Sequence, residues 1–555
     1  MRRVIAVCLG LAACAWIAPA AAAKPRVLRV GTYKGIHGQF KSIQAAVNAA
    51  KPGDWVLVGP GDYKTTSSSA PKGATDTPAA VLITTPRLHL RGMNRKTVVI
   101  DGTKSGPKCN AITADQNFGP AGDSGNPPKG LNGVMVWKAN NVQVENMTTC
   151  NFLGGSGDAG NGFWWNGGDG SAKLGGWGYY GAYLTSTSTY FDPNNSQASA
   201  EYGIFSSNWV GGTWFNMYAS NMNDSGFYIG ACQQQCHQTV NDIWAEYNAL
   251  GYSGSNSGGY LVVKNSQFDN NEDGFDTNSQ NGDNPPPQNG ACPNNGISPI
   301  THTHSCWVFM HNRVHDNNNP NIPSAGLAAA GPVGTGMSIS GGRNDTVMDN
   351  VFYNNDAWGT IFVPFPDSGP PCTGGTNIGA VCLYDESGDA LLDNTYYDNG
   401  GYKNPTNGDF AFTNTEPGPT SCFSGNRDTK GPLTGTPYAE QMYPKCTGKT
   451  VAPSDTNPES AQFTEEVACD STLVVSGTTK APCAPGDNYP RRTKVDMDHP
   501  LPASIQTMPN PCKGVPANPW CRVHRKRGKS ADPRRHRGPS TDPDHDGDRD
   551  RRGQR

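Results

Sequence analysis

The chain of 555 residues contains no apolar run long enough to cross a bilayer. The longest candidate, residues 4–17, is shorter than the roughly 20 apolar residues that a membrane helix needs. A basic M-R-R start precedes this run, and small residues follow it as far as Ala23. This order is typical of a secretory signal peptide, so we predict a signal peptide over residues 1–23 and a secreted protein. An alternative is a lipobox, L-A-A-C, which would anchor the protein at the cell surface through Cys14.

Charged residues are also scarce, at 16% of the chain, and the body of the protein has no excess of positive charge. From Arg491 onward there are 16 basic and 8 acidic residues, a net charge of +8. Because the whole chain carries −3, residues 1–490 carry −11. An acidic body argues against a nucleic-acid partner and leaves carboxylates available for cations.

A second metal-ligand cluster is missing beside Cys232-x-x-x-Cys236-His237, which argues against a zinc site. Of the 16 cysteines, Cys8 and Cys14 lie in the predicted signal peptide, and an even number remains. Even numbers in a secreted chain indicate disulfides, although spacing leaves their connectivity open. Proximity in the sequence favours seven pairs: Cys109 with Cys150, Cys232 with Cys236, Cys292 with Cys306, Cys372 with Cys382, Cys422 with Cys446, Cys469 with Cys483, and Cys512 with Cys521.

The central part of the chain lacks helical periodicity and instead repeats a short motif in which two asparagines flank four residues. The copies are N-MTTC-N from Asn146, N-MYAS-N from Asn216, N-SQFD-N from Asn265, N-RVHD-N from Asn312, N-VFYN-N from Asn350 and N-TYYD-N from Asn394. A seventh, from Ile243, keeps only the second asparagine, Asn248. Short β-rich stretches precede most copies, and 22 residues separate Ile243 from Asn265. This spacing predicts a β-solenoid whose stacked coils share one core, with the asparagines forming amide ladders between coils.

The amino-terminal part of the mature chain predicts a cap for the open end of this solenoid. Residues 40–50 carry apolar side chains at helical spacing, and P-G-D follows them. Residues 55–58 then form a predicted strand, and residues 60–63 a predicted turn. A cap is needed because an open solenoid end exposes unpaired strand edges.

The stretch F-K-S-I-Q-A-A-V followed by K-P-G-D-W-V-L-V-G-P-G-D-Y resembles the opening of pectin-lyase-like proteins, and residues 88–102 resemble their first full coil. This resemblance covers residues 29–415 and implies a right-handed parallel β-helix. It implies no single activity, because that fold hosts several enzyme classes and inert proteins. Motifs that pectin methylesterases (Q-D-T-L, D-F-I-F-G), polygalacturonases (G-H-G) and alginate epimerases (D-P-H-D) use are missing from the predicted β-helix.

The run Glu272-Asp273-Gly274-Phe275-Asp276 resembles the acidic calcium-binding cluster of family nine pectate lyases, with a glutamate where the family has its first aspartate. The resemblance implies Ca²⁺ ligands at Glu272, Asp273 and Asp276, and no organic cofactor. Calcium prefers several oxygen ligands, so we expect another from Glu246 or Asn248 on the preceding coil. The structural alternative is a turn whose aspartates bond their own backbone.

In such lyases a basic side chain removes the proton next to the substrate carboxylate. Arg313 on the next coil is the first candidate for this base, and His311, His315 and Arg343 are the alternatives.

An aromatic and glycine-rich insertion, residues 162–184, offers rings that could stack on sugars. The candidate carbohydrate-binding residues are Trp164, Trp165, Trp177, Tyr179 and Tyr180. The alternative is a loop that packs its aromatic residues over the flank of the solenoid.

The expected organisation is therefore a signal peptide (1–23), an all-β parallel β-helix (24–415), an irregular Cys/Pro-rich covering region (416–521) and a disordered charged tail (522–555). Two functions fit this organisation. One is a calcium-assisted, pectate-lyase-like polysaccharide lyase acting as a monomer on an acidic glycan. The other is a non-catalytic surface or matrix protein whose β-helix presents a binding face.

Overall fold

The computed structural model describes residues 24–521 except for residues 169–170, 172, 282–286, 327, 369–371, 414–420, 436–444, 447–459, 477–482, 498 and 500–501. The predicted signal peptide and charged tail lie outside the described residues. No helix in the described part of the chain is long and apolar enough to span a membrane.

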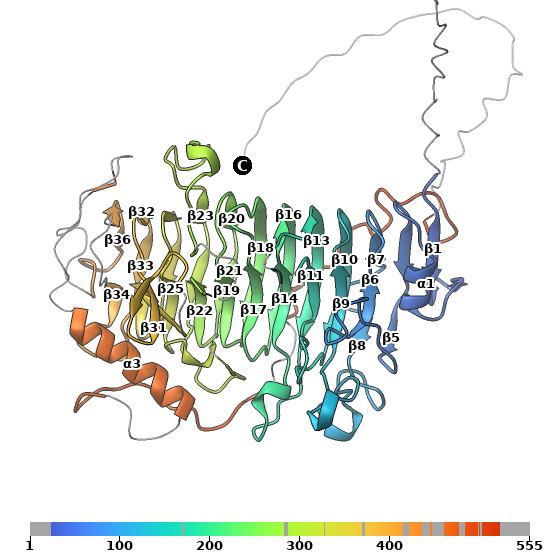
Figure 1. The fold of residues 1–555 in the computed structure, drawn as a ribbon, viewed down its shortest axis with the longest axis horizontal. Coiled ribbons are helices and arrows are strands. Elements are labelled where there is room, and N and C mark those ends of the chain that lie inside the picture. The colour runs from blue at the N-terminus through green and yellow to red at the C-terminus, as the bar shows by residue number, and fades with distance from the viewer. Residues whose placement is uncertain are drawn as a thin grey trace, which may run out of the picture.

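Two large sheets of parallel strands run along the molecule, which is elongated in Figure 1. We call them the nineteen-strand sheet and the ten-strand sheet. The nineteen-strand sheet contains β1 (Val27–Val30), β4 (Trp55–Val58), β5 (Gly61–Lys64), β7 (His89–Gly92), β8 (Val98–Asp101), β10 (Val142–Cys150), β13 (Tyr179–Thr187), β16 (Gly212–Ser220), β18 (Gln238–Glu246), β20 (Leu261–Lys264), β21 (Gln267–Asp269), β23 (Trp307–Met310), β24 (Arg313–His315), β26 (Asp345–Met348), β27 (Val351–Tyr353), β32 (Ala390–Leu392), β33 (Thr395–Tyr397), β35 (Cys422–Ser424) and β36 (Arg427–Asp428). The ten-strand sheet contains β6 (Ala79–Ile83), β9 (Asn132–Trp137), β11 (Phe163–Asn166), β14 (Tyr202–Ser207), β17 (Ser225–Gly230), β19 (Leu250–Ser255), β22 (Asp273–Asn278), β25 (Thr335–Ser340), β28 (Trp358–Val363) and β34 (Gly408–Phe412).

Smaller elements decorate this body. They are the β2–β3 hairpin (Thr32–Tyr33, Ile36–His37), the pair β12–β15 (Gly176–Trp177, Trp209–Val210), the three-stranded sheet β29–β31–β30 (Phe365–Ser368, Val381–Tyr384, Thr376–Ile378), the helices α1 (Ile43–Ala49) and α3 (Ser460–Ser476), and five short 3-10 turns. Helix α1 begins at the cap Ser42, and its buried face packs against β1, β4 and β6.

One coil of the solenoid consists of β20, β21 and β22, and the coil β23, β24 and β25 stacks on it in parallel register. In the coils just before these, one nine-residue strand takes the place of the first two strands, as in β10, β13, β16 and β18. Strand β18, for example, pairs with both β20 and β21. The chain therefore advances one strand spacing per turn, and the predicted right-handed parallel β-helix is confirmed.

The core lies between the sheets and runs continuously from coil to coil. Phe275 stacks on Tyr252 of the neighbouring coil with ring centroids 4.3 Å apart, and Phe268 meets it edge-on at 5.5 Å. Both phenylalanines are fully buried. No coil encloses its aromatic residues alone, which is the reason why stacking stabilises the fold.

Two amide ladders follow the bends between strands. Their rungs are Ser266, Asn312, Asn350, Asn394 and Asn426 in one ladder, and Asn248, Asn271, Asn317, Asn355 and Asn399 in the other. Each amide donates to the next amide oxygen; the Asn312 Nδ2 to Asn350 Oδ1 distance, for example, is 3.1 Å. The predicted ladders therefore exist.

The predicted register of the ladders is wrong by one residue in several coils. Asn265 and Asn270 are not rungs: they have φ of 53° and 56°, and the rungs are the following residues, Ser266 and Asn271. Asn146 and Asn216 also adopt positive φ. Asparagine tolerates the left-handed conformation better than most residues, so one residue type occupies two adjacent positions for two different reasons.

Seven disulfides join the cysteines, and each joins the partners that proximity in the sequence predicts. Most of them clip loops between strands, and such a crosslink stabilises mainly by restricting the unfolded chain. The sequence separation between bonded cysteines ranges from 4 to 41 residues. The bonds are Cys109 to Cys150, Cys232 to Cys236, Cys292 to Cys306, Cys372 to Cys382, Cys422 to Cys446, Cys469 to Cys483, and Cys512 to Cys521.

The covering region differs from the irregular segment that its composition predicts. It contains α3, a helix of 17 residues. Phe463 and Cys469 of α3 are buried with Trp358, Ile361 and Ala411 of the ten-strand sheet. These apolar residues follow helical spacing, but the flanking segments are rich in Pro, Thr and Ser. The composition of those flanking segments led to the prediction of an irregular region.

After α3 the chain returns along the solenoid as a strap, which we define as residues 483–497, 499 and 502–521 (Figure 1). Arg492 contacts Glu272 in the middle of the molecule. Thr507 bonds Asn146, and Trp520 donates its indole N–H to the Ile36 carbonyl near the first coil. The strap thus joins the two ends of the β-helix.

Replacing Trp520 with alanine should detach the end of the strap. Trp520 is 4% exposed and packs with Trp55, Leu57 and Met93. Truncating a buried tryptophan costs about 3 kcal/mol or more, and here we expect the loss as local opening rather than global unfolding. Limited proteolysis should cut residues 502–521 faster, whereas Trp177→Ala, at a side chain 57% exposed, should leave the cleavage rate unchanged. Unaltered protection in Trp520→Ala would show that the strap is held elsewhere.

Candidate active site

The outer face of the ten-strand sheet carries one row of side chains in register. The row is Trp164, Phe205, Tyr228, Ser253, Asp276, Ser338 and Ile361. Its aromatic members stack, with ring centroids 5.0 Å apart for Trp164 and Phe205 and 4.6 Å for Phe205 and Tyr228. They form a cluster separate from the main core. The aromatic half of the row leads directly to the polar half.

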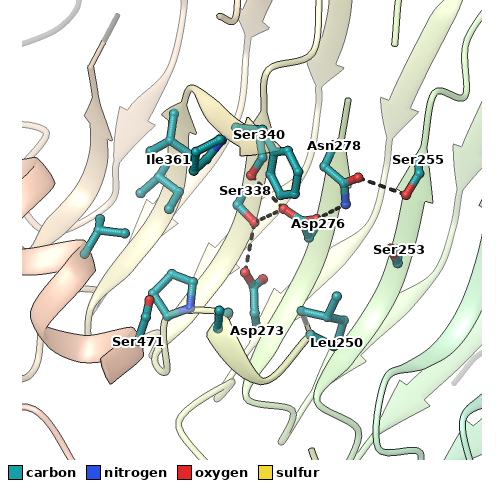
Figure 2. A pocket seen from close by; sticks show the side chains of 18 of the residues that line it. Leu250, Ser253, Ser255, Asp273, Asp276, Asn278, Ser338, Ser340, Ile361 and Ser471 are labelled. Atoms are coloured by element: carbon teal, nitrogen blue, oxygen red, sulfur yellow. Dashed lines mark hydrogen bonds between the residues drawn. The ribbon is translucent and has the colours of Figure 1, made fainter. Parts of the chain in front are cut away.

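A cavity of about 610 Å³ opens over the polar half. Its floor is formed by β14, β17, β19, β22, β25 and β28. One wall is the loop around residues 328–332, and another is α3, from which Thr464, Val467, Ala468 and Ser471 face the cavity. Figure 2 shows Ser471 on one side and Asp273, Asp276 and Asn278 on the floor. A site of this size suits a few sugar rings.

Asp276 lies at the centre of the floor and is held by three donors. The hydroxyls of Ser338 and Ser340 both lie 2.8 Å from Oδ1, and the Asn278 amide lies 2.8 Å from Oδ2. Burial raises the pKa of the Asp276 carboxyl, and these three hydrogen bonds oppose the rise. Donors on both oxygens favour the carboxylate form.

Asp273 is fully buried beside Asp276 and shares Ser338 with it. The Ser338 hydroxyl lies 2.9 Å from Asp273 Oδ2, and a hydroxyl has only one proton to donate. Both contacts are satisfied when protonated Asp273 donates to Ser338 and Ser338 donates to ionised Asp276. Burial, and after it the charge of Asp276, raise the pKa of Asp273 well above its usual range, in agreement with this arrangement.

Two further carboxyls line the cavity, on the coils nearer the amino terminus. Asp224 directly precedes β17, and Glu201 directly precedes β14. Burial raises the pKa of Asp224 to about 7, and the charge of Asp276 adds to the rise. Burial together with Asp224 raises the pKa of Glu201 to about 8. Both groups are therefore poised to hold or release a proton near neutral pH.

Glu272 does not face the same space as Asp273 and Asp276. Its carboxylate pairs with Arg492 of the strap at 3.2 Å, and it is not among the residues that line the cavity. Burial outweighs this ion pair and raises the pKa of Glu272 to about 8. The other predicted ligands lie elsewhere: Glu246 accepts a hydrogen bond from the Tyr218 hydroxyl on the nineteen-strand sheet, and Asn248 is a ladder rung.

Among the described residues, the four predicted carboxylate ligands, Glu246, Glu272, Asp273 and Asp276, do not form a cluster of converging oxygen atoms within metal-binding distance. The arrangement therefore does not fit a calcium ion held jointly by Glu272, Asp273 and Asp276, and calcium binding stays a prediction.

The predicted bases lie away from the cavity. Arg313 and His315 belong to β24 of the nineteen-strand sheet, where His315 stacks on Tyr353 at 4.4 Å. His311 precedes that strand and lies 3.7 Å from Asp349. Arg343 follows β25 and donates to the Asp385 carbonyl. No lysine, arginine or histidine occurs among the described residues that line the cavity. A position on the adjacent coil did not place these basic residues near the acidic cluster, because each coil has more than one face.

The aromatic insertion is part of the β-helix. Trp165 and Tyr179 are 1% and 6% exposed and stack on each other inside the core at 4.7 Å. Trp164 belongs to the outer row but is 3% exposed, Tyr180 is partly buried, and Trp177 is 57% exposed. This corrects the expectation of an exposed platform made by all five rings. Alternation along a strand explains the difference, because neighbouring residues point to opposite faces.

Sequence reasoning overlooked Glu201, Asp224 and Ser338. A signal for the first two exists in hindsight. An acidic residue precedes glycine by two positions in Glu201-Tyr-Gly, Asp224-Ser-Gly and Glu272-Asp-Gly, and the pattern marks the start of a strand in the ten-strand sheet each time. The repeated position predicts a row of acids along one edge of that sheet.

Acids in the α3 interface make stability depend on pH. Burial, followed by the charges of Glu272 and Asp273, raises the pKa of Asp470 on α3 well above its usual range. A carboxyl whose pKa is raised on folding stabilises the fold fully below its unfolded value near 4 and loses that contribution as pH rises toward its folded pKa.

We therefore expect the protein to have a lower Tm at pH 8 than at pH 5, and Asp470→Asn to reduce that difference. Thermal unfolding across this pH range measures both effects. An equal pH dependence in the variant would show that the pKa of Asp470 is not raised on folding.

No protein-family model matches the chain, and no curated protein matches it in sequence. Several solved structures are similar in fold. The A-module of the mannuronan C-5 epimerase AlgE4 from Azotobacter vinelandii has a TM-score of 0.40 at 13% identity, covering 70% of this chain and 90% of that one. A polygalacturonase from Erwinia carotovora has a TM-score of 0.36 at 13% identity, covering 73% and 94%. A mannuronic acid-specific family 6 polysaccharide lyase from human gut microbiota has a TM-score of 0.37 at 10% identity, covering 73% and 83%.

Proposed function

We propose that this protein is an extracellular glycoside hydrolase that binds a polysaccharide across the outer face of the ten-strand sheet. The observation that carries the proposal is one cavity lined by four carboxyls, Glu201, Asp224, Asp273 and Asp276, which differ in burial and hydrogen bonding. Asp276 accepts hydrogen bonds from three donors, which favour its carboxylate form, while burial raises the pKa of Asp224 to about 7. Glycoside hydrolysis uses such a pair, one carboxyl as acid and one as nucleophile or base.

In the proposed reaction Asp224 donates a proton to the leaving glycosidic oxygen. The Asp276 carboxylate either attacks the sugar carbon from which that oxygen departs or activates a water molecule there. Asp273 acts as a positioning residue, because it contacts Asp276 through Ser338. Of the stacked rings, Tyr228 lines the cavity and can contact a bound sugar there.

A lyase reaction is supported less well by this geometry. Elimination needs a base beside the proton that is removed, and none of the four predicted bases lines the cavity. An aqueous assay in isotope-labelled water separates the two reactions. Hydrolysis incorporates the labelled oxygen into the new sugar end, whereas elimination produces an ultraviolet-absorbing unsaturated uronate without it.

The test is incubation of the mature protein with neutral, acidic and amino polysaccharides, each with calcium and with a chelator. New reducing ends carrying labelled oxygen would support the hydrolase. Unsaturated products that require calcium would overturn it in favour of the lyase. A flat result on every polymer would contradict catalysis on those glycans and favour a binding protein.

The rate of cleavage should fall on the alkaline side. Asp224 must carry its proton to act as the acid, and its pKa is about 7, so we expect kcat/KM to decline as pH rises through this value. Asp224→Asn should remove this decline and lower kcat about 100-fold. A pH–rate profile of both proteins tests the assignment, and a decline that persists in the variant would place the acid elsewhere.

A further inference from the structure

Glu201 is a cavity carboxyl for which the proposed reaction has no use. It lies one coil away from Asp224, since the Ser225 amide donates to the Glu201 carbonyl at 3.2 Å. The charged and titratable groups around it are Asp224, Asp158 and Tyr202. Among the described residues no cationic side chain lines this cavity, so nothing there neutralises the carboxylates.

The same end of the cavity also offers an unused hydroxyl and aromatic faces. Ser253 is 6% exposed and lines the cavity next to Asp276 in the strand register, and its hydroxyl has no hydrogen-bond partner in the described part of the chain. Figure 2 shows its side chain on the strand that also carries Ser255, beside the strand of Asp276 and Asn278. The rings of Tyr202 and Tyr228 lie beside it, with centroids 5.0 Å apart.

We infer that this end of the cavity binds a protonated amino sugar, with Glu201 as the residue that determines specificity. This inference rests on the proposed hydrolase and names its substrate class. A carboxylate attracts an ammonium group strongly in a site with little water, and aromatic faces attract a cation as well. A polyuronate would bring its own carboxylates into a cavity whose described lining offers no cationic side chain to pair with them, so the expected acidic glycan is the least suitable substrate.

The test compares three oligosaccharides of equal length: glucosamine oligomers, the same oligomers after N-acetylation, and oligogalacturonate. Calorimetry on the wild-type protein at pH 6 measures binding, and mass spectrometry of the same samples measures cleavage. We expect glucosamine oligomers to bind at least tenfold more tightly than their acetylated counterparts, because acetylation removes the charge and keeps the sugar chain.

Glu201→Gln should abolish this preference while leaving binding of the acetylated oligomer within about twofold. Asp158→Asn is the matched control, because Asp158 also acts on Glu201 but is exposed and does not line the cavity; it should keep the preference. Ionisation of Glu201 on binding should also release protons at pH 7, which calorimetry in buffers of different ionisation enthalpy detects.

The outcomes separate the two proposals. Equal binding of amine and acetylated oligomers, or tighter binding of oligogalacturonate, would overturn the amino-sugar site even if a glycan is hydrolysed. Selective binding of glucosamine oligomers that depends on Glu201, without cleavage of any polymer, would support the site and overturn the hydrolase.

Discussion

Asp276→Asn is expected to lower kcat about 10³-fold on whichever glycan the protein cleaves, with little change in stability. Asparagine matches aspartate in shape but cannot serve as a nucleophile or base, and general acid–base groups contribute factors of this size. The Asn278, Ser338 and Ser340 contacts are made by side chains that can reorient. Initial rates of reducing-end formation, together with the Tm of both proteins, measure the effect.

The control for this substitution is Asp349→Asn. Asp349 is also an aspartate near a strand, but it is exposed on the other sheet and faces His311. We expect unchanged kcat in this variant. If Asp276→Asn retained more than a tenth of wild-type kcat, Asp276 would not be the group that attacks the sugar or activates water, and the assignment of the site would be wrong.

Ser338→Ala separates the role of Asp273 from that of Asp276. It removes the hydroxyl that joins the two carboxyls but leaves Asp276 with donors from Ser340 and Asn278. A positioning role predicts a smaller loss of kcat than in Asp276→Asn, with a shift in the pH profile as the visible sign.

The coil architecture could be predicted because it depends on local rules repeated many times. Each copy of the asparagine motif marks a bend, and disulfides such as Cys292 to Cys306 join cysteines that flank one loop. The shape of one coil, however, does not determine which side chains share a face. Arg313 was expected near Asp276 because it is on the next coil, yet it lies on β24 of the other sheet.

The strap and α3 could not be predicted for a different reason. They pack against surfaces built by residues hundreds of positions earlier in the chain, as in the contact between Arg492 and Glu272. The composition of a segment indicates whether it can form a hydrophobic core of its own, and the segment that contains α3 and the strap cannot. The cavity wall formed by α3 therefore depends on a tertiary contact that no local pattern in the sequence records.

Only two of the four cavity acids could be predicted from the sequence, because the other two also depend on tertiary contacts. Asp273 and Asp276 stand together in the sequence, and the acidic run indicated a site there. Asp224 and Glu201 belong to the same cavity only because parallel strands place the starts of successive coils side by side. A single acidic position that recurs from coil to coil is harder to recognise in the sequence than several acids in one run. In the folded protein, stacking brings the recurring acids as close together as the acids of a run.

Asn350→Ala is expected to destabilise the protein by about 4 kcal/mol, a large effect for one polar residue. Asn350 is 1% exposed. It donates to the Phe309 carbonyl at 2.9 Å and to Asn394 Oδ1 at 3.0 Å, and it accepts from the backbone and side-chain amides of Asn312. Alanine keeps the backbone bond to Asn394 Oδ1 but removes every bond made by the Asn350 side chain, and each buried group that loses its partner costs about 1–3 kcal/mol.

Two variants make this prediction specific to the ladder. Asn350→Ser should recover about half of the loss, because Ser266 is a natural rung that still accepts a backbone amide, that of Ile243, at 3.2 Å. Asn265→Ala should cost only about 1–2 kcal/mol, the strain of alanine at positive φ, since Asn265 is exposed and precedes the rung. Urea unfolding monitored by tryptophan fluorescence gives the three free energies. Equal losses at Asn350 and Asn265 would mean that asparagine matters here for its backbone conformation, and that the amide ladder adds little to the stacking of the coils.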